Sequence, residues 1–120
     1  MKPHQQRIIH RAITIFGEKN QTMQTIEELM ELQKALFENV HRGTDNVKNI
    51  TEEVADVEIM LAQIKKIYQL DPNIIEQTKD YKLERLDHTI SKYLAKKAEP
   101  TKITSQKPSV QIDRDTSNGR

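Results

Sequence analysis

The sequence predicts an all-α domain. Its 120 residues include only three glycines and four prolines, whereas Leu, Ile, Glu, Lys and Gln are abundant. This composition favours helices over a turn-rich β architecture. The apolar residues also recur at helical rather than alternating spacing. A chain of this length is most simply one domain with one core.

Four helices are expected, each with a recognisable start or stop. Pro3 and Pro72 fit first helical turns, and Gly17 and Gly43 interrupt the apolar pattern. The third helix is expected to begin with a capping box in which Asn49 is followed three residues later by Glu52. The expected helices run roughly over residues 3–17, 21–41, 49–70 and 72–97, with residues 18–21 as a polar link between the first two.

The helical domain is predicted to cover residues 1–98, followed by a disordered tail at 99–120. The tail has two prolines, no aromatic residue and few apolar ones. Such a segment cannot bury enough apolar surface to offset the entropy of ordering it.

Charge and cysteine content exclude several classes of function. The chain has 19 Lys and Arg residues and 18 Asp and Glu residues, which gives a net charge of +1. Because it lacks the positive surplus of a nucleic-acid-binding protein, no nucleic-acid partner is expected. The chain has no cysteine, so a metal would need oxygen or imidazole ligands. No stretch reads as a signal peptide or a membrane span. We therefore expect a cytoplasmic protein with no membrane partner.

Two carboxylates of the third helix lie at the edge of its apolar stripe. At about 100° per residue, the stripe fills an arc of roughly 80°. Glu53 lies about 20° outside this arc and Asp56 about 60° further round. Both acids are therefore expected to face a packed neighbour. The stripe consists of Ile50, Val54, Val57, Leu61, Ile64 and Tyr68.

The second helix carries a matching pair, Glu28 and Glu31, on a stripe that borders its apolar face. That apolar face is expected to consist of Ile26, Leu29, Met30, Leu32, Leu36, Phe37 and Val40. A short connection lets the two helices pack antiparallel, which would bring the four acids around one small volume.

Four clustered carboxylates need positive charge or protons. Two of them about 5 Å apart repel by roughly 3 kcal/mol at an effective dielectric of 20. Hard divalent cations suit such oxygen ligands, and Mg²⁺ commonly completes its coordination with phosphate oxygens. The cluster therefore predicts a Mg²⁺ site, with Mn²⁺ as a substitute, and a phosphorylated substrate. A single ExxE or ExxD alone is usually a solvated helix surface, which is our interpretation of Glu27 and Glu58.

Glu28–Glu31 as ExxE, followed by Glu53–Asp56 as ExxD after a short Gly-containing loop, resembles the MazG-like nucleoside triphosphate pyrophosphohydrolases. The likeness extends to GEKNQ before the second helix and to EEVADVEIML around the third, and covers roughly residues 5 to 95. It implies a four-helix-bundle fold of the MazG type, assembled as homodimers or dimers of dimers.

The resemblance also implies Mg²⁺-dependent hydrolysis of nucleoside triphosphates to the monophosphate and pyrophosphate. Glu28, Glu31, Glu53 and Asp56 would be the metal ligands and catalytic residues. One of these acids, or the metal alone, would activate the attacking water, and the sequence leaves this choice open.

Substrate contacts are expected from both ends of the domain. The last helix of the family often offers basic residues to the phosphates, and Lys82 and Arg85 occupy such positions, although each also fits a solvated helix edge. Asn20 and Gln21 are candidates for contacts to sugar or base, with a role at the helix start as the alternative. Leu86 and Thr89 depart from the family pattern, so the substrate preference is open.

Two other functions compete with the enzyme. The chain could be a helical interaction module that binds a partner helix and uses its acids for solvation. A family member that binds nucleotide without cleaving it is a third reading, which the presence of all four acids weakens. Ala55, Ile59 and Ala62 form a second apolar group on the third helix, which a homodimer would cover.

Overall fold

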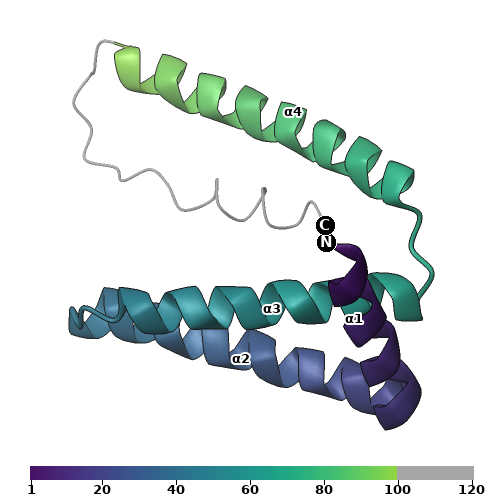
Figure 1. Cartoon of the computed structure of the whole chain (residues 1–120). Helices are drawn as coiled ribbons and strands as arrows, with labels where there is room; N and C mark the ends of the chain where they lie inside the picture. Colours follow the sequence, from purple (N-terminus) through teal and green to yellow (C-terminus); the bar gives the residue numbers. More distant parts are fainter. Residues whose placement is uncertain (100–120) are drawn as a thin grey trace. The chain divides into compact units, whose positions relative to one another are not determined.

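The computed structural model describes residues 1–99, and these form helices without any strand. The helices are α1 (Pro3–Phe16), α2 (Glu18–Arg42), α3 (Val47–Ile67) and α4 (Pro72–Ala98) (Figure 1). The expected all-α class is confirmed. The predicted tail lies, apart from Glu99, outside the described residues.

The chain divides into two compact units, and the boundary falls between Asp71 and Pro72. The first unit contains α1, α2 and α3, and the second contains α4. None of the helices within residues 1–99 is long and apolar enough to cross a membrane.

A single residue separates α1 from α2. Gly17 has φ +95° and ψ 150°, a backbone conformation that residues with a side chain rarely adopt. Its N–H donates to the carbonyl of Ile13, and its own carbonyl accepts from the N–H of Gln21. The expected polar link at 18–21 is therefore wrong, because the glycine alone turns the chain and α2 begins at Glu18.

The packed part of the first unit is an antiparallel hairpin of α2 and α3 (Figure 1). Helix α2 ends where Gly43 adopts the left-handed conformation, with φ +66°, the usual glycine stop. Only residues 43–46 connect the two helices. Helix α1 contacts both partners at the end of the hairpin where α2 begins and α3 finishes.

Helix α3 begins three residues earlier than the capping box predicted. Its N-cap is Asn46, and Asn49 lies inside the helix. The Asn46 side chain makes no cap hydrogen bond but reaches back to α2, where its Nδ2 donates to the Ala35 carbonyl at 3.0 Å. Its Oδ1 accepts from Asn39 Nδ2 at 3.1 Å. Contact with α2, rather than local capping, sets where α3 begins.

The other end of α3 also differs from the expectation, since the helix stops at Ile67 rather than near Leu70. Gln69 has φ +52°. The Leu70 N–H donates to the Lys65 carbonyl at 2.9 Å, and the Gln69 N–H to the Lys66 carbonyl at 3.2 Å. This is the Schellman arrangement, in which a left-handed residue satisfies the last carbonyls of a helix.

The buried face of α3 matches the stripe that apolar periodicity predicted only in part, since Val57 is buried and Ile50 and Ile64 are half-buried. Val54, Leu61 and Tyr68 are 39%, 42% and 56% exposed. The buried face of α3 is instead turned toward Glu53, which is half-buried. On α2, Leu32 is half-buried, and the other expected apolar residues are exposed. The buried residues of the first unit are Ile9, Ala35, Val57 and Met60, with the polar Gln21, Thr25 and Gln63.

We predict that Asn46→Ala lowers the free energy of unfolding by about 1–2 kcal/mol, because it removes side-chain hydrogen bonds that tie α3 to α2. Chemical denaturation measures this loss. The matched control is Asn49→Ala, an exposed position inside the helix, where alanine should be neutral or slightly stabilising. A larger loss at Asn49 than at Asn46 would show that the helix starts where the capping box placed it.

Candidate metal centre

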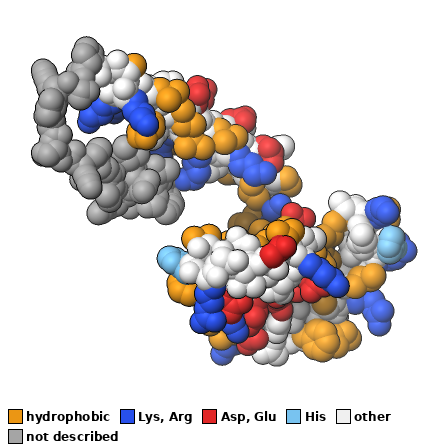
Figure 2. All heavy atoms as spheres, turned by 90° about the vertical axis from the view of Figure 1, so that its left-hand side faces the viewer, with side chains coloured by type: hydrophobic (Ala, Val, Ile, Leu, Met, Phe, Trp, Pro, Cys, Tyr) orange, Lys and Arg blue, Asp and Glu red, His pale blue; other side chains and the backbone are white. Residues whose placement is uncertain are grey.

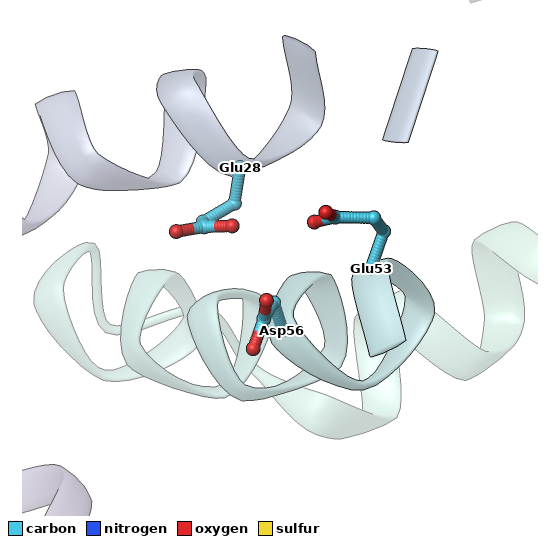
Figure 3. A group of neighbouring side chains, drawn as sticks. All are labelled: Glu28, Glu53 and Asp56. Carbon is cyan, nitrogen blue, oxygen red and sulfur yellow. The ribbon is translucent and has the colours of Figure 1, made fainter. Parts of the chain in front are cut away.

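Three of the four predicted acids meet between α2 and α3. Glu28 comes from α2, whereas Glu53 and Asp56 come from adjacent turns of α3. One carboxylate oxygen from each can be chosen so that all three lie within 4.8 Å of one another. In Figure 3 the Glu28 and Glu53 side chains extend toward each other from facing helices, with Asp56 beside them. Antiparallel packing produces this meeting, because Glu28 is 25 or more positions from the other two acids in the sequence.

The cluster has few hydrogen-bonding partners. Gln24 Nε2, one turn before Glu28, donates to Glu28 Oε2 at 2.9 Å. Glu53 Oε1 is buried and has no hydrogen-bond partner. Among residues 1–99, no Lys, Arg or His forms an ion pair with any of the three acids. Figure 2 shows acidic side chains gathered on one face of the first unit.

Burial raises the pKa of the Glu53 carboxyl above its ordinary value of 4.5. The negative charges of Asp56, Glu28, Glu31 and Glu52 raise it further, in that order. A carboxylate that is both desolvated and surrounded by like charge needs a proton or a cation. Oxygen ligands of this kind, close together and without basic neighbours, fit a hard divalent cation better than a soft one.

Glu31 lies one turn along α2 from Glu28 and is exposed. It is outside the close group of three, although its charge acts on the pKa of Glu53. The structure therefore brings together three of the predicted ligands and leaves the fourth beside them.

Asn20 and Gln21 both have structural partners. Asn20 Nδ2 donates to the Phe16 carbonyl at 2.8 Å, across the junction of α1 and α2. Gln21 is 9% exposed, and its Nε2 donates to Gln63 Oε1 at 2.8 Å. The Asn20 contact is that of the helix-start alternative, whereas Gln21 bonds across the interface to α3. The substrate role of the two amides stays a prediction.

Lys82 and Arg85 lie on α4, in the second unit. The Arg85 guanidinium lies over the Tyr81 ring, 5.7 Å from its centroid, a cation–π contact one turn apart on the same helix. Their expected role as phosphate ligands stays a prediction.

Gln24 and Gln63 are the residues around the site that sequence reasoning missed. Gln24 contacts Glu28 directly, and Gln63 is 4% exposed in the same helix interface. Because glutamine is polar, a hydrophobic pattern assigns it to the surface, and apolar periodicity therefore gave no indication that these two residues lie at the interface. The seven-residue spacing of Gln63 from Asp56, matching that of Gln21 from Glu28, is the one pattern that could have found it.

No family model, curated protein or solved structure matches this chain. The assignment of a function therefore depends on the site itself.

We predict that the metal-free protein becomes less stable as the pH rises from about 4.5 toward neutrality. The folded pKa of Glu53 is higher than the unfolded one, so the unfolded chain releases this proton first. The contribution of the protonated Glu53 carboxyl to the free energy of unfolding is complete below the pKa of Glu53 in the unfolded chain. It is lost as the pH rises through the pKa of Glu53 in the folded protein. Chemical denaturation in the presence of a chelator, repeated across a pH series, measures this change in the free energy of unfolding.

Glu53→Gln should remove this part of the pH dependence and be more stable than the wild type at pH 8. Glu58→Gln, on an exposed turn of the same helix, is the control and should retain the dependence. Equal pH profiles for wild type and Glu53→Gln would contradict the prediction.

Proposed function

We propose that this protein is a Mg²⁺-dependent nucleoside triphosphate pyrophosphohydrolase of the MazG-like type. The observation that carries the proposal is the meeting of Glu28, Glu53 and Asp56 within 4.8 Å, with a buried Glu53 oxygen that no group in residues 1–99 satisfies. Unsatisfied buried oxygens are rare in proteins and call for an explanation.

The residues fit Mg²⁺ on the chemistry of their donors. All three are carboxylates on two helices, and rigid elements hold ligands in place better than loops do. Glu28, Glu53 and Asp56 would hold the cation, with the exposed Glu31 as the fourth acid of the pattern. Mg²⁺ keeps water molecules and accepts phosphate oxygens in the rest of its shell, so a triphosphate is a suitable substrate.

The proposed reaction transfers the nucleoside α-phosphoryl group to water. One P–O bond of the bridge between the α- and β-phosphates breaks, and water supplies the new oxygen, giving a nucleoside monophosphate and pyrophosphate. Bound Mg²⁺ would offset the negative charge that develops on the phosphate oxygens. The role left to the chain is to orient the water and to accept its proton, and a carboxylate such as Glu31 or Glu53 is suited to that.

The proposal includes an oligomer. Within residues 1–99 many large apolar side chains are exposed, including Phe37 at 53% and Leu29 at 44%, and Figure 2 shows orange patches on the surface of the first unit. Surface of this kind is usually covered by a partner. A homodimer or dimer of dimers is part of the proposal, and so is the role of Lys82 and Arg85 as phosphate ligands.

A helical interaction module is the second candidate, and the same exposed apolar residues favour it. The two candidates differ in the role of the acids, because an interaction module has no need of a carboxylate cluster with a buried, unpaired oxygen. Turnover therefore separates them.

We predict pyrophosphate release from one or more members of a panel of ribo- and deoxynucleoside triphosphates, only when Mg²⁺ or Mn²⁺ is present. Glu53→Gln and Asp56→Asn should each lower kcat/KM at least about 100-fold, which corresponds to roughly 2.7 kcal/mol of lost transition-state stabilisation. Glu27→Gln and Glu58→Gln, at exposed positions, are the matched controls and should retain activity. A folded protein without turnover on the whole panel would favour the interaction module.

We also predict that the wild type takes up Mn²⁺ in isothermal titration calorimetry and that the bound metal raises its thermal stability, because the cation binds the folded state preferentially. Glu28→Gln should weaken this uptake at least about tenfold, or roughly 1.4 kcal/mol. The control is Glu27→Gln, the neighbouring exposed acid on α2. Equal Mn²⁺ affinity in both variants would remove Glu28 from the site.

A further inference from the structure

A buried amide pair lies in the same helix interface as the acids. Gln21 and Gln63 are 9% and 4% exposed, and Gln21 Nε2 donates to Gln63 Oε1 at 2.8 Å. Gln63 Nε2 is directed at Met60 Sδ, 3.7 Å away. Thr25 is buried as well, and its Oγ1 donates to the Gln21 carbonyl. The interface is thus polar where a helix pair would ordinarily be apolar.

The amide pair and the acids share one register. Gln21 precedes Glu28 by seven residues on α2, and Gln63 follows Asp56 by seven on α3. Seven residues are about two helical turns, so each glutamine lies about 10.5 Å along the same stripe from its acid. Because the helices are antiparallel, a register that pairs Gln21 with Gln63 also pairs Glu28 with Asp56.

The carboxylates themselves oppose this register. They repel one another, and the fully buried apolar residues of α2 and α3 are few, namely Ala35, Val57 and Met60. A slip by one turn would shift one helix by about 5.4 Å, which exceeds the 4.8 Å span of the three acids. The same slip would leave both amides buried and unpaired, and unpaired buried polar groups are strongly disfavoured.

We propose that the Gln21–Gln63 hydrogen bond is a register lock that positions Glu28 against Glu53 and Asp56, so that both glutamines are positioning residues for the metal centre. Single buried polar residues that fix register are established in coiled coils. The significance of the lock for catalysis rests on the proposed function, whereas the lock itself rests on the geometry of the hairpin.

The test uses the full-length chain with Gln21→Leu and Gln63→Leu, singly and together. Each single change leaves one buried amide without its partner and should raise the unfolding equilibrium constant about tenfold. The double change removes both amides and should lower the stability by less than either single change. A double variant whose loss of stability equals the sum of the two single losses, or one that does not fold, overturns the lock, since additive losses mean that the two residues do not act on each other.

Register is measured directly in the double variant. The chain has no native cysteine, so Lys34→Cys and Glu52→Cys, at exposed positions of α2 and α3, can carry nitroxide labels for pulsed distance measurements in samples diluted with unlabelled protein. We expect one distance in the wild type and a second population, shifted by several ångström, in the double variant. A single unchanged distance in the folded double variant overturns the proposal.

The second readout is the affinity for Mn²⁺ alone, measured by titration calorimetry. The double variant should bind Mn²⁺ at least tenfold more weakly than the wild type. Gln33→Leu/Gln77→Leu replaces two exposed glutamines and should change neither readout. A Mn²⁺ affinity within twofold of wild type in the double variant overturns the proposal.

The proposed function and the lock can fail separately. If the wild type takes up Mn²⁺ but hydrolyses no triphosphate, the proposed function fails while the lock stands. If it takes up no Mn²⁺, the distance measurement decides alone.

Discussion

The antiparallel contact between α2 and α3 is the constraint on which the rest of the first unit depends. It places acids that are far apart in sequence within 4.8 Å, although they repel one another. The attraction that opposes this repulsion is modest, because the buried apolar residues of the contact are few and one of them, Ala35, is small. A small residue allows two helices to approach closely.

Polar anchors lie at both ends of this contact. At one end Gln21 bonds Gln63, and at the other Asn46 bonds the Ala35 carbonyl and accepts from Asn39. Glu28 is seven residues from Gln21 and seven from Ala35, so it lies midway between the anchors. Directional hydrogen bonds specify position more sharply than apolar contacts do. A site that needs aligned charges therefore has its alignment set by polar groups on either side.

The apolar surface of the hairpin has a different role from the one its periodicity suggested. Val54, Leu61 and Tyr68 on α3 and Leu29, Leu36 and Phe37 on α2 follow helical spacing but are between 39% and 56% exposed. They are available to partners outside the first unit, in keeping with the proposed oligomer. The face that packs within the hairpin is the more polar one, and it is this face that carries the acids.

The sequence by itself determined the all-α class and the four helices, because composition and glycine stops are local properties. The spacing of the acids predicted that Glu28 would meet Glu53 and Asp56, and the antiparallel packing of α2 and α3 brings these three together. It placed the start of α3 at Asn49 rather than Asn46, and it included Val54 and Leu61, which are exposed, in a buried stripe with Val57. Only the tertiary structure decided these points. A hydrophobic pattern records which residues avoid water but not which neighbour covers them, and the partners of Asn46 and Gln63 lie on another helix.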